Sequence, residues 1–255
     1  MNAVIDRLGG GWRLAIAAVI CGLAGIAVGW YWQAQRSGSD AATSLGAGER
    51  AAIEKLVHDY VLEHPEILPE AMENLRRRET VKLLSGVRDK VEIPFPGAVL
   101  GNPSGKVTLV EFSDFACGYC RQSVGEVDAL IAANPDLKVV IRQLPILSPA
   151  SAAAARMSLA AAEQGKFAAF HHAMFAAGNP DAQTIEAAAR SAGLDMDRAR
   201  RILTDPRIDA EIERNMQFAR QLGFQGTPSW VIGEEVHSGA VGREQLSRSI
   251  AKARS

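Results

Sequence analysis

The sequence predicts an α/β protein in which a block of helices interrupts a β-sheet. Two apolar, β-branched segments, 107–112 and 137–146, predict strands, and the segment between them predicts a helix. Every segment from 149 to 223 then has a helical pattern, and two short strands and a helix end the chain. This order is typical of one sheet layer covered by helices, with a helical insertion in its middle.

Length and charge limit the classes of function. The chain has 255 residues, of which 47% are hydrophobic, and a formal net charge of −1. This length suits one well-filled domain with an appendage. Because the charge is balanced and Lys and Arg are scattered, we expect no nucleic-acid partner.

Residues 1–36 predict a cytoplasmic tip and a transmembrane signal anchor. No charged residue lies between Leu14 and Trp32, and a helix of this length just crosses a hydrocarbon core of about 30 Å. Arg7 and Arg13 precede the apolar run, which places the amino terminus in the cytoplasm and the remainder outside. The alternative is a cleaved signal peptide that leaves a soluble protein. Either way we expect a periplasmic protein.

A small, polar segment, 37–48, predicts a flexible linker, and 49–92 predicts a helical arm. Helical spacing gives the arm one apolar stripe, composed of Ile53, Leu56, Val57, Tyr60 and Val61. Pro65 and Pro69 interrupt the helix, and Pro69 suits the first position of a second one. The arm has no core of its own, so we expect it to drive self-association as a dimer or trimer. The alternative is a helix that folds back on its own domain.

Residues 93–255 predict the main domain, with the helical insertion at 149–223. Three prolines and three glycines in 91–106 mark the boundary before it. Ser148 and Pro149 are typical of a helix start, and glycines end the successive helical segments. Two short strands flank a turn at Gly233.

A Cys-x-x-Cys pair, Cys117 and Cys120, directly follows the first strand. A cysteine at a helix start faces free N–H groups and the positive end of the helix dipole, which favour its thiolate. Cys120, one turn later, is placed to attack a mixed disulfide formed at Cys117, so the pair suits thiol–disulfide exchange. A structural zinc site needs four ligands, and no histidine pair has the required spacing, so we expect no metal site. A two-cysteine Cu(I) site stays open as a side activity.

Two stretches resemble the DsbA-type branch of the thioredoxin superfamily: VTLVEFSDFACGYC and GFQGTPSWVIG. The resemblance covers roughly 91–255 and implies a thioredoxin-like fold. It implies that Pro228 is cis and lies against the active-site disulfide, and that Thr227 offers its backbone N–H and C=O to a substrate peptide. The alternative is an ordinary trans proline. Glu111 matches the family's buried acid, which implies a raised pKa and transfer of the Cys120 proton; the alternative is a glutamate that points to water.

The dipeptide Gly118-Tyr119 is expected to tune the redox poise of the pair and, with Thr227, to bind the substrate. Strongly oxidising members of the family resemble Cys-Pro-His-Cys. Without a histidine between its cysteines, the pair of this chain is expected to be less oxidising than theirs. CGYC is similar to the pair of periplasmic disulfide isomerases and of ScsC copper-sensitivity suppressor proteins. The segment YVLEHPEILPEAMENLRRRE resembles the ScsC amino-terminal extension, an oligomerisation arm in relatives.

Together these features predict a periplasmic protein-disulfide oxidoreductase that favours the isomerase or reductase direction. We expect it to need no cofactor. Its expected partners are misfolded or oxidised periplasmic proteins, a membrane thiol reductase that recycles the cysteines, and further copies of itself. The alternatives are a DsbA-like dithiol oxidase and a non-enzymatic Cu(I)-binding or adaptor protein.

Overall fold

The computed structural model describes residues 29, 31–32 and 46–254. The expected membrane anchor therefore lies outside the described residues, apart from Gly29, Tyr31 and Trp32. Among the helices that are described, none is both long and apolar enough to cross a membrane.

The described chain alternates helices with five strands. The amino-terminal part contains α2 (Ala47–Glu63), α3 (Ile67–Ser85) and α4 (Arg88–Val91). The first half of the sheet region contains β1 (Val99–Gly101), β2 (Val107–Ser113), α5 (Gly118–Ala133) and β3 (Leu137–Gln143). The helices that follow are α6 (Pro149–Ala162), α7 (Phe167–Ala177), α8 (Ala182–Ser191), α9 (Met196–Ile202) and α10 (Pro206–Gln221). The end comprises β4 (Ser229–Ile232), β5 (Glu235–Ser238) and α11 (Gly242–Ala253).

The five strands form one mixed sheet in the order β1-β3-β2-β4-β5. β2 and β3 are parallel, whereas the other neighbouring pairs are antiparallel. The predicted α/β order is confirmed, but β1 lies inside the segment that we interpreted only as a boundary. A strand of three residues is too short to show an alternating pattern. The glycine before it, Gly97, has φ of 84°, and a Cβ there would lie 2.4 Å from the Ala162 carbonyl oxygen.

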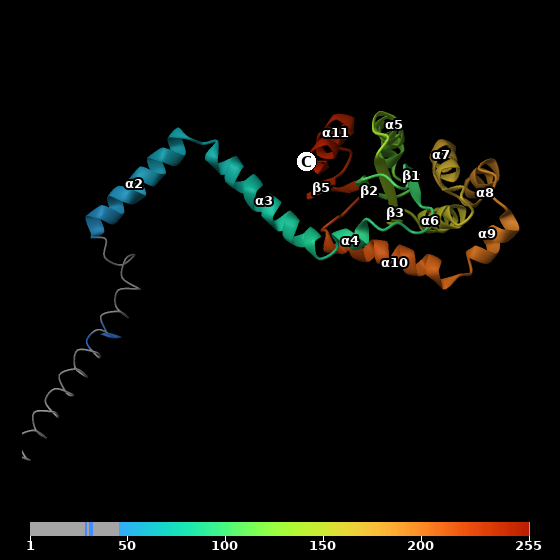
Figure 1. Cartoon of the computed structure of the whole chain (residues 1–255), viewed down its shortest axis with the longest axis horizontal. Helices are drawn as coiled ribbons and strands as arrows, with labels where there is room; N and C mark the ends of the chain where they lie inside the picture. Colours follow the sequence, from blue (N-terminus) through green and yellow to red (C-terminus); the bar gives the residue numbers. More distant parts are fainter. Residues whose placement is uncertain (1–28, 30, 33–45, 255) are drawn as a thin grey trace, which may run out of the picture. The chain divides into compact units, whose positions relative to one another are not determined.

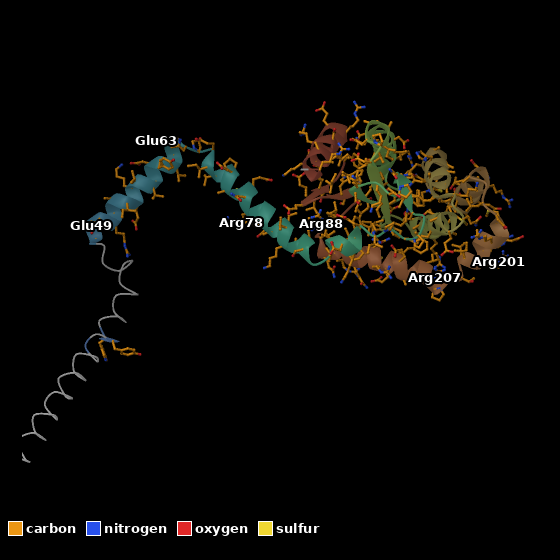
Figure 2. All side chains as sticks on the ribbon, in the orientation of Figure 1. Glu49, Glu63, Arg78, Arg88, Arg201 and Arg207 are labelled. Carbon is orange, nitrogen blue, oxygen red and sulfur yellow. The ribbon has the colours of Figure 1, made fainter. Side chains whose placement is uncertain are left out.

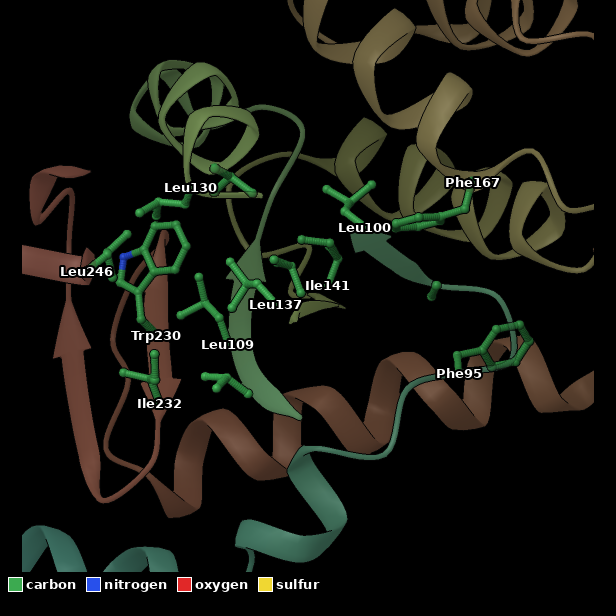
Figure 3. Close-up of a cluster of buried hydrophobic side chains, with 14 of the residues drawn as sticks. Phe95, Leu100, Leu109, Leu130, Leu137, Ile141, Phe167, Trp230, Ile232 and Leu246 are labelled. Atoms are coloured by element: carbon green, nitrogen blue, oxygen red, sulfur yellow. The ribbon is translucent and has the colours of Figure 1, made fainter. Parts of the chain in front are cut away.

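Helices cover both faces of the sheet (Figure 1). On one face, Leu109 and Trp230 of the sheet pack with Leu130 of α5 and Leu246 of α11 (Figure 3). On the other face, Phe112 packs in one cluster with Phe218 of α10. Because side chains alternate along a strand, neighbouring residues of β2 pack into the cores on opposite faces of the sheet. Both faces of the sheet are therefore apolar.

The inserted helices have a third core beside the sheet. Phe115, just before the cysteine pair, belongs to it together with Phe170 and Met174 of α7. The predicted start of α6 is confirmed, since the Ser148 side chain accepts a hydrogen bond from the Ser151 N–H. Arginines such as Arg201 and Arg207 project outward from the last helices of the block (Figure 2). The insertion thus packs one apolar side next to the cysteine-bearing turn.

The described chain divides into two compact units between Ala71 and Met72, within α3. α3 begins at Ile67 rather than at Pro69. Pro69 then lies in the first turn, where the missing N–H has no partner in a helix anyway. In the second unit, Leu84 and Val91 are buried in the core that contains Phe218. Part of the segment that we assigned to the arm therefore packs with the main domain.

Candidate active site

Cys117 is the residue that caps the start of α5. Its N–H donates to the Asp114 carbonyl at 2.9 Å, which closes the turn between β2 and α5. Its sulfur accepts a hydrogen bond from the Cys120 N–H at 3.3 Å and donates one to the Thr227 carbonyl at 3.2 Å. The thiol is therefore held between the helix start and the loop that precedes β4.

The Thr227–Pro228 peptide bond is cis, as the resemblance implies. Thr227 is half-buried and Pro228 is buried, and the loop that they form reaches Cys117 across 110 positions of sequence. The hydroxyl oxygen of Thr227 is buried without a hydrogen-bond partner in the described structure. The Thr227 carbonyl, which we expect to bind a substrate peptide, accepts a hydrogen bond from the Cys117 thiol in this structure.

Both cysteines are free thiols, and both are buried. Cys117 is 4% exposed and Cys120 is 0% exposed, so the second thiol lies deeper. Burial raises the pKa of the Cys120 thiol, and the nearby Glu111 carboxyl raises it further. Cys120 thus stays protonated at neutral pH unless a neighbouring base takes its proton.

Glu111 lies in the middle of the sheet, between Ile141 of β3 and Trp230 of β4. It is 3% exposed, which rules out the alternative of a glutamate in water. Burial raises the pKa of Glu111 to about 8, while the Ser113 hydroxyl acts in the opposite direction. A carboxyl group that titrates near neutral pH suits proton transfer, as expected from the resemblance.

The dipeptide between the cysteines lies in the first turn of α5. Tyr119 is 63% exposed, so its ring is available to another molecule. A Cβ at Gly118 would meet nothing within 4 Å, so space alone does not require glycine there.

The structure brings the five predicted chemical residues together: Cys117, Cys120, Glu111, Thr227 and Pro228. The sequence reasoning missed Asp114. This carboxylate is buried and accepts hydrogen bonds from the Ile146 and Leu147 N–H groups at 2.8 and 2.9 Å, and from the Ala116 N–H at 2.8 Å. An acidic residue between an apolar strand and a cysteine pair is a signal that could have found it.

The neighbouring histidines of α7 have different surroundings. His171 is buried, and burial lowers its pKa to about 3, so it stays neutral. His172 is paired with Asp128 of α5 at 3.0 Å. In the part of the chain that the structure describes, no group of three or more His, Cys, Asp or Glu side chains could hold a metal ion.

Residues 108–251, more than half of the chain, match the family described as DSBA-like thioredoxin domain. The chain belongs to this family. Residues 49–80 match a second family, the copper resistance protein ScsC N-terminal domain. The α/β architecture of this DSBA-like protein is accordingly thioredoxin-like, with α6 to α10 as its insertion.

The solved structures that are similar to this DSBA-like protein include two that cover different lengths of it. A thioredoxin-like oxidoreductase from Silicibacter pomeroyi is 41% identical, with a TM-score of 0.59, over 61% of this chain and 91% of that one. A Proteus mirabilis ScsC variant with a linker deletion and a point mutation is 28% identical, with a TM-score of 0.63. That match covers 83% of this chain and 97% of the variant, so it extends beyond the thioredoxin-like domain.

Curated relatives include longer proteins. The Na(+)/H(+) antiporter NhaA 3 of Salinispora tropica is 33% identical over 159 residues, which are 61% of this chain. The chain spans about a quarter of the length of such relatives, 24% in this case. The antiport activity in that name is therefore not carried over to this chain.

Proposed function

We propose that this protein exchanges disulfides with other proteins through Cys117 and Cys120, in the isomerase or reductase direction. The main support is the position of the Cys117 sulfur, between the Cys120 N–H and the Thr227 carbonyl at the start of α5. At this position the sulfur accepts a backbone N–H of the helix start, and the Thr227 carbonyl beside it can serve a substrate chain once the thiol is consumed.

The proposed reaction has two steps. The Cys117 thiolate attacks a substrate disulfide, forms a mixed disulfide, and releases one substrate sulfur as a thiolate. In reduction, Cys120 then loses its proton to Glu111 and attacks the Cys117 sulfur, which releases the second substrate thiolate. In isomerisation, a substrate thiolate makes the second attack instead, and Cys117 is regenerated.

The surface around Cys117 suits an unfolded protein segment. A cavity of about 250 Å³ beside Thr227 is lined by Gly226, Ser238 and Gly239, among others. Tyr119 in the first turn of α5 and Ile146 and Leu147 in the loop after β3 have exposed apolar side chains, and Asp114 joins this loop to the cysteine turn. Exposed apolar residues beside a reactive group favour a polypeptide substrate.

Insulin reduction and the refolding of ribonuclease with scrambled disulfides test this proposal. Cys117→Ser is expected to abolish both activities, and Cys120→Ser to abolish reduction while mixed disulfides accumulate. Cys21→Ser is the control, because Cys21 belongs to the segment predicted as membrane anchor, and it is expected to behave as wild type. Activity that survives Cys117→Ser would disprove the proposal.

The direction is tested by the redox state of the cysteines in cells. Alkylation of free thiols is expected to label both Cys117 and Cys120, because a membrane thiol reductase keeps an isomerase or reductase reduced. A mainly oxidised pair would favour a dithiol oxidase. Tight binding of one Cu(I) without disulfide exchange would favour the copper-binding alternative.

We further propose that the protein acts in the periplasm and that residues 1–36 tether it to the inner membrane. The support is the uncharged run that follows Arg13. Alkaline carbonate extraction of membranes is expected to leave the full chain in the pellet. Release of a shorter chain into the soluble periplasmic fraction would indicate a cleaved signal peptide instead.

A further inference from the structure

Arg121 is a charged residue of the cysteine-bearing helix that the proposed reaction does not use. It directly follows Cys120, and its backbone N–H donates to the Cys117 carbonyl at 3.1 Å, so it lies one helical turn after Cys117. Side chains of a helix tilt toward its amino terminus, and residues four positions apart share one face. The Arg121 side chain therefore begins on the side of α5 that carries the reactive cysteine.

The charge of Arg121 has no carboxylate beside it. Arg121 is half-buried, and one of its Nη groups donates to the Asn179 side-chain oxygen at 3.3 Å, just after the end of α7. Among the residues that the structure describes, its Nε–H group is buried without an acceptor, and the guanidinium forms no ion pair. Asp181, the acid that follows Asn179 in sequence, instead accepts the Thr184 N–H at the start of α8. A guanidinium is always charged and binds a carboxylate well, so Arg121 suits an acidic ligand.

The other segments around Cys117 carry no exposed charge. None of the three segments that reach the cysteine turn contains Asp, Glu, Lys or Arg; they are 144–151, 223–229 and 238–242. Within 113–120 the single charged residue is Asp114, which is buried and accepts three backbone N–H groups. In these segments nothing opposes the field of Arg121, so a substrate that approaches Cys117 meets one positive charge.

We propose that Arg121 gives the protein a preference for disulfides flanked by acidic residues, because its guanidinium pairs with a substrate carboxylate while Cys117 attacks. This proposal rests on the disulfide exchange proposed above and names its substrate class. In the attack, a bond forms between the Cys117 sulfur and one substrate sulfur, the substrate disulfide breaks, and the other sulfur leaves with the electron pair. Arg121 makes no bond to these sulfurs, so it determines specificity rather than catalysing the exchange.

Three peptides test this preference on the full chain. Each peptide contains one cysteine, which is bound to thiopyridine as a mixed disulfide and is flanked on both sides by Glu, Gln or Lys. When Cys117 attacks the peptide sulfur, thiopyridone leaves, and its absorbance gives the rate. Cys117→Ser, in which Cys21 and Cys120 remain, provides the background rate. The leaving group is the same in all three peptides, so differences in rate report on the flanking charge.

The wild-type chain is expected to react fastest with the Glu peptide and slowest with the Lys peptide. Arg121→Gln is expected to lower the ratio of these two rates by about threefold to tenfold, because a unit charge acts on another over about one helical turn near a protein surface. Arg121→Lys keeps the charge and is expected to keep most of the ratio. A change in the thiolate fraction of Cys117 affects both peptides equally, so it cancels in the ratio.

Asn179→Asp tests the charge while Arg121 stays in place. It replaces the amide oxygen that lies 3.3 Å from the guanidinium with a carboxylate, and it is expected to lower the ratio as Arg121→Gln does. The matched control is Arg248→Gln. Arg248 is exposed, forms no ion pair with the described residues, and lines a cavity with Ala133 at the other end of α5. The control is expected to keep the wild-type ratio, whereas added salt is expected to lower it in the wild type.

An equal ratio in wild type and Arg121→Gln would overturn the specificity role. So would an equal fall of the ratio in Arg248→Gln, because that result indicates an effect of the total charge of the protein. If the wild-type chain reacts with none of the peptides faster than Cys117→Ser does, the exchange function itself is contradicted. The two failures are therefore distinguishable.

Discussion

Glu111 shows how one buried residue links stability to chemistry. Its pKa is raised because the sheet and α5 exclude water from its carboxyl group. A proton acceptor needs a pKa near the working pH, and burial supplies this at the expense of folding free energy. The same residue should therefore be visible in unfolding experiments as well as in kinetics.

Glu111→Gln is expected to remove a pH dependence of stability. Between the ordinary glutamate pKa, near 4.5, and about 8, the unfolded chain loses a proton that the folded chain keeps. The wild-type free energy of unfolding should fall as pH rises through this window and stop falling above it, by a few kcal/mol in total (~3–5). The difference between wild type and Glu111→Gln, measured by urea unfolding, isolates this effect. The exposed Glu79→Gln serves as control, and a pH-independent difference for Glu111→Gln would contradict the prediction.

At the level of secondary-structure elements, Asp114 joins three parts of the site. It lies in the turn from β2 to α5, and its carboxylate accepts the N–H groups of Ile146 and Leu147, which follow β3. The predicted strand 137–146 consequently ends at Gln143, because the residues after it turn toward Asp114. Its carbonyl also accepts the Cys117 N–H, so the exposed loop and the reactive thiol share one anchor.

Asp114→Ala is expected to lower the free energy of unfolding by about 2–5 kcal/mol, because three N–H groups lose a charged acceptor. Hydrogen exchange of the Ile146 and Leu147 amides should accelerate at the same time. Asp195→Ala is the matched control: it removes a carboxylate that caps α9 through the Arg198 N–H, and should cost about 1 kcal/mol without affecting these amides. Unchanged exchange at 146–147 in Asp114→Ala would contradict the prediction.

Over the whole molecule, a buried arginine holds the segment before the sheet in place. Arg142 of β3 donates to the carbonyl oxygens of Lys90, Val91 and Ile93, and to Glu211 of α10 at 2.6 Å. Its side chain is 2% exposed, so almost all of this network is inside the protein. A truncation that starts at Phe95 would remove these carbonyls along with the buried Leu84 and Val91.

Arg142→Met is expected to lower the free energy of unfolding by about 3–5 kcal/mol, because it leaves the Glu211 carboxylate buried without its main partner. Adding Glu211→Leu should recover part of this loss, since two apolar side chains then pack together. Arg156→Met, at a surface pair with Asp209, is the control and should cost about 1 kcal/mol or less. A single and a double variant of equal stability would contradict the prediction.

The arm is the part of the molecule that we propose to make oligomers. α2, all of whose residues are described, contains no buried residue, and its stripe exposes Ile53, Leu56, Val57 and Tyr60. Covering such side chains contributes roughly 1.5–3 kcal/mol for each one that becomes fully buried. A second copy of the arm has a matching stripe.

Leu56→Glu is expected to convert a dimer or trimer into monomers, as measured by light scattering of the chain beginning at Gly46. Leu62→Glu is the matched control, because Leu62 is also exposed, 67% against 69%, but lies on the opposite side of α2 from the stripe. It should leave the assembly intact. A monomeric wild-type chain, or equal effects of both substitutions, would contradict self-association through the stripe.

Local patterns were enough to predict most of the elements and the reactive pair. Strand composition, the Ser148-Pro149 helix start and the spacing of Cys117 and Cys120 all act within one turn or one strand, where propensity and hydrogen bonding decide the structure. The short β1 and the burial of Leu84 and Val91 depend on residues that are distant in sequence, so no local pattern reports them. The position of Asp114 before the cysteine pair is a local signal, but its partners Ile146 and Leu147 lie 32 and 33 positions away and could not be read from it. The contact of Arg121 with Asn179 spans 58 positions and is likewise not visible in a local pattern. Burial, and with it the raised pKa values of Glu111 and Cys120, is a property of the packed sheet and helices, because only tertiary packing removes water from these groups.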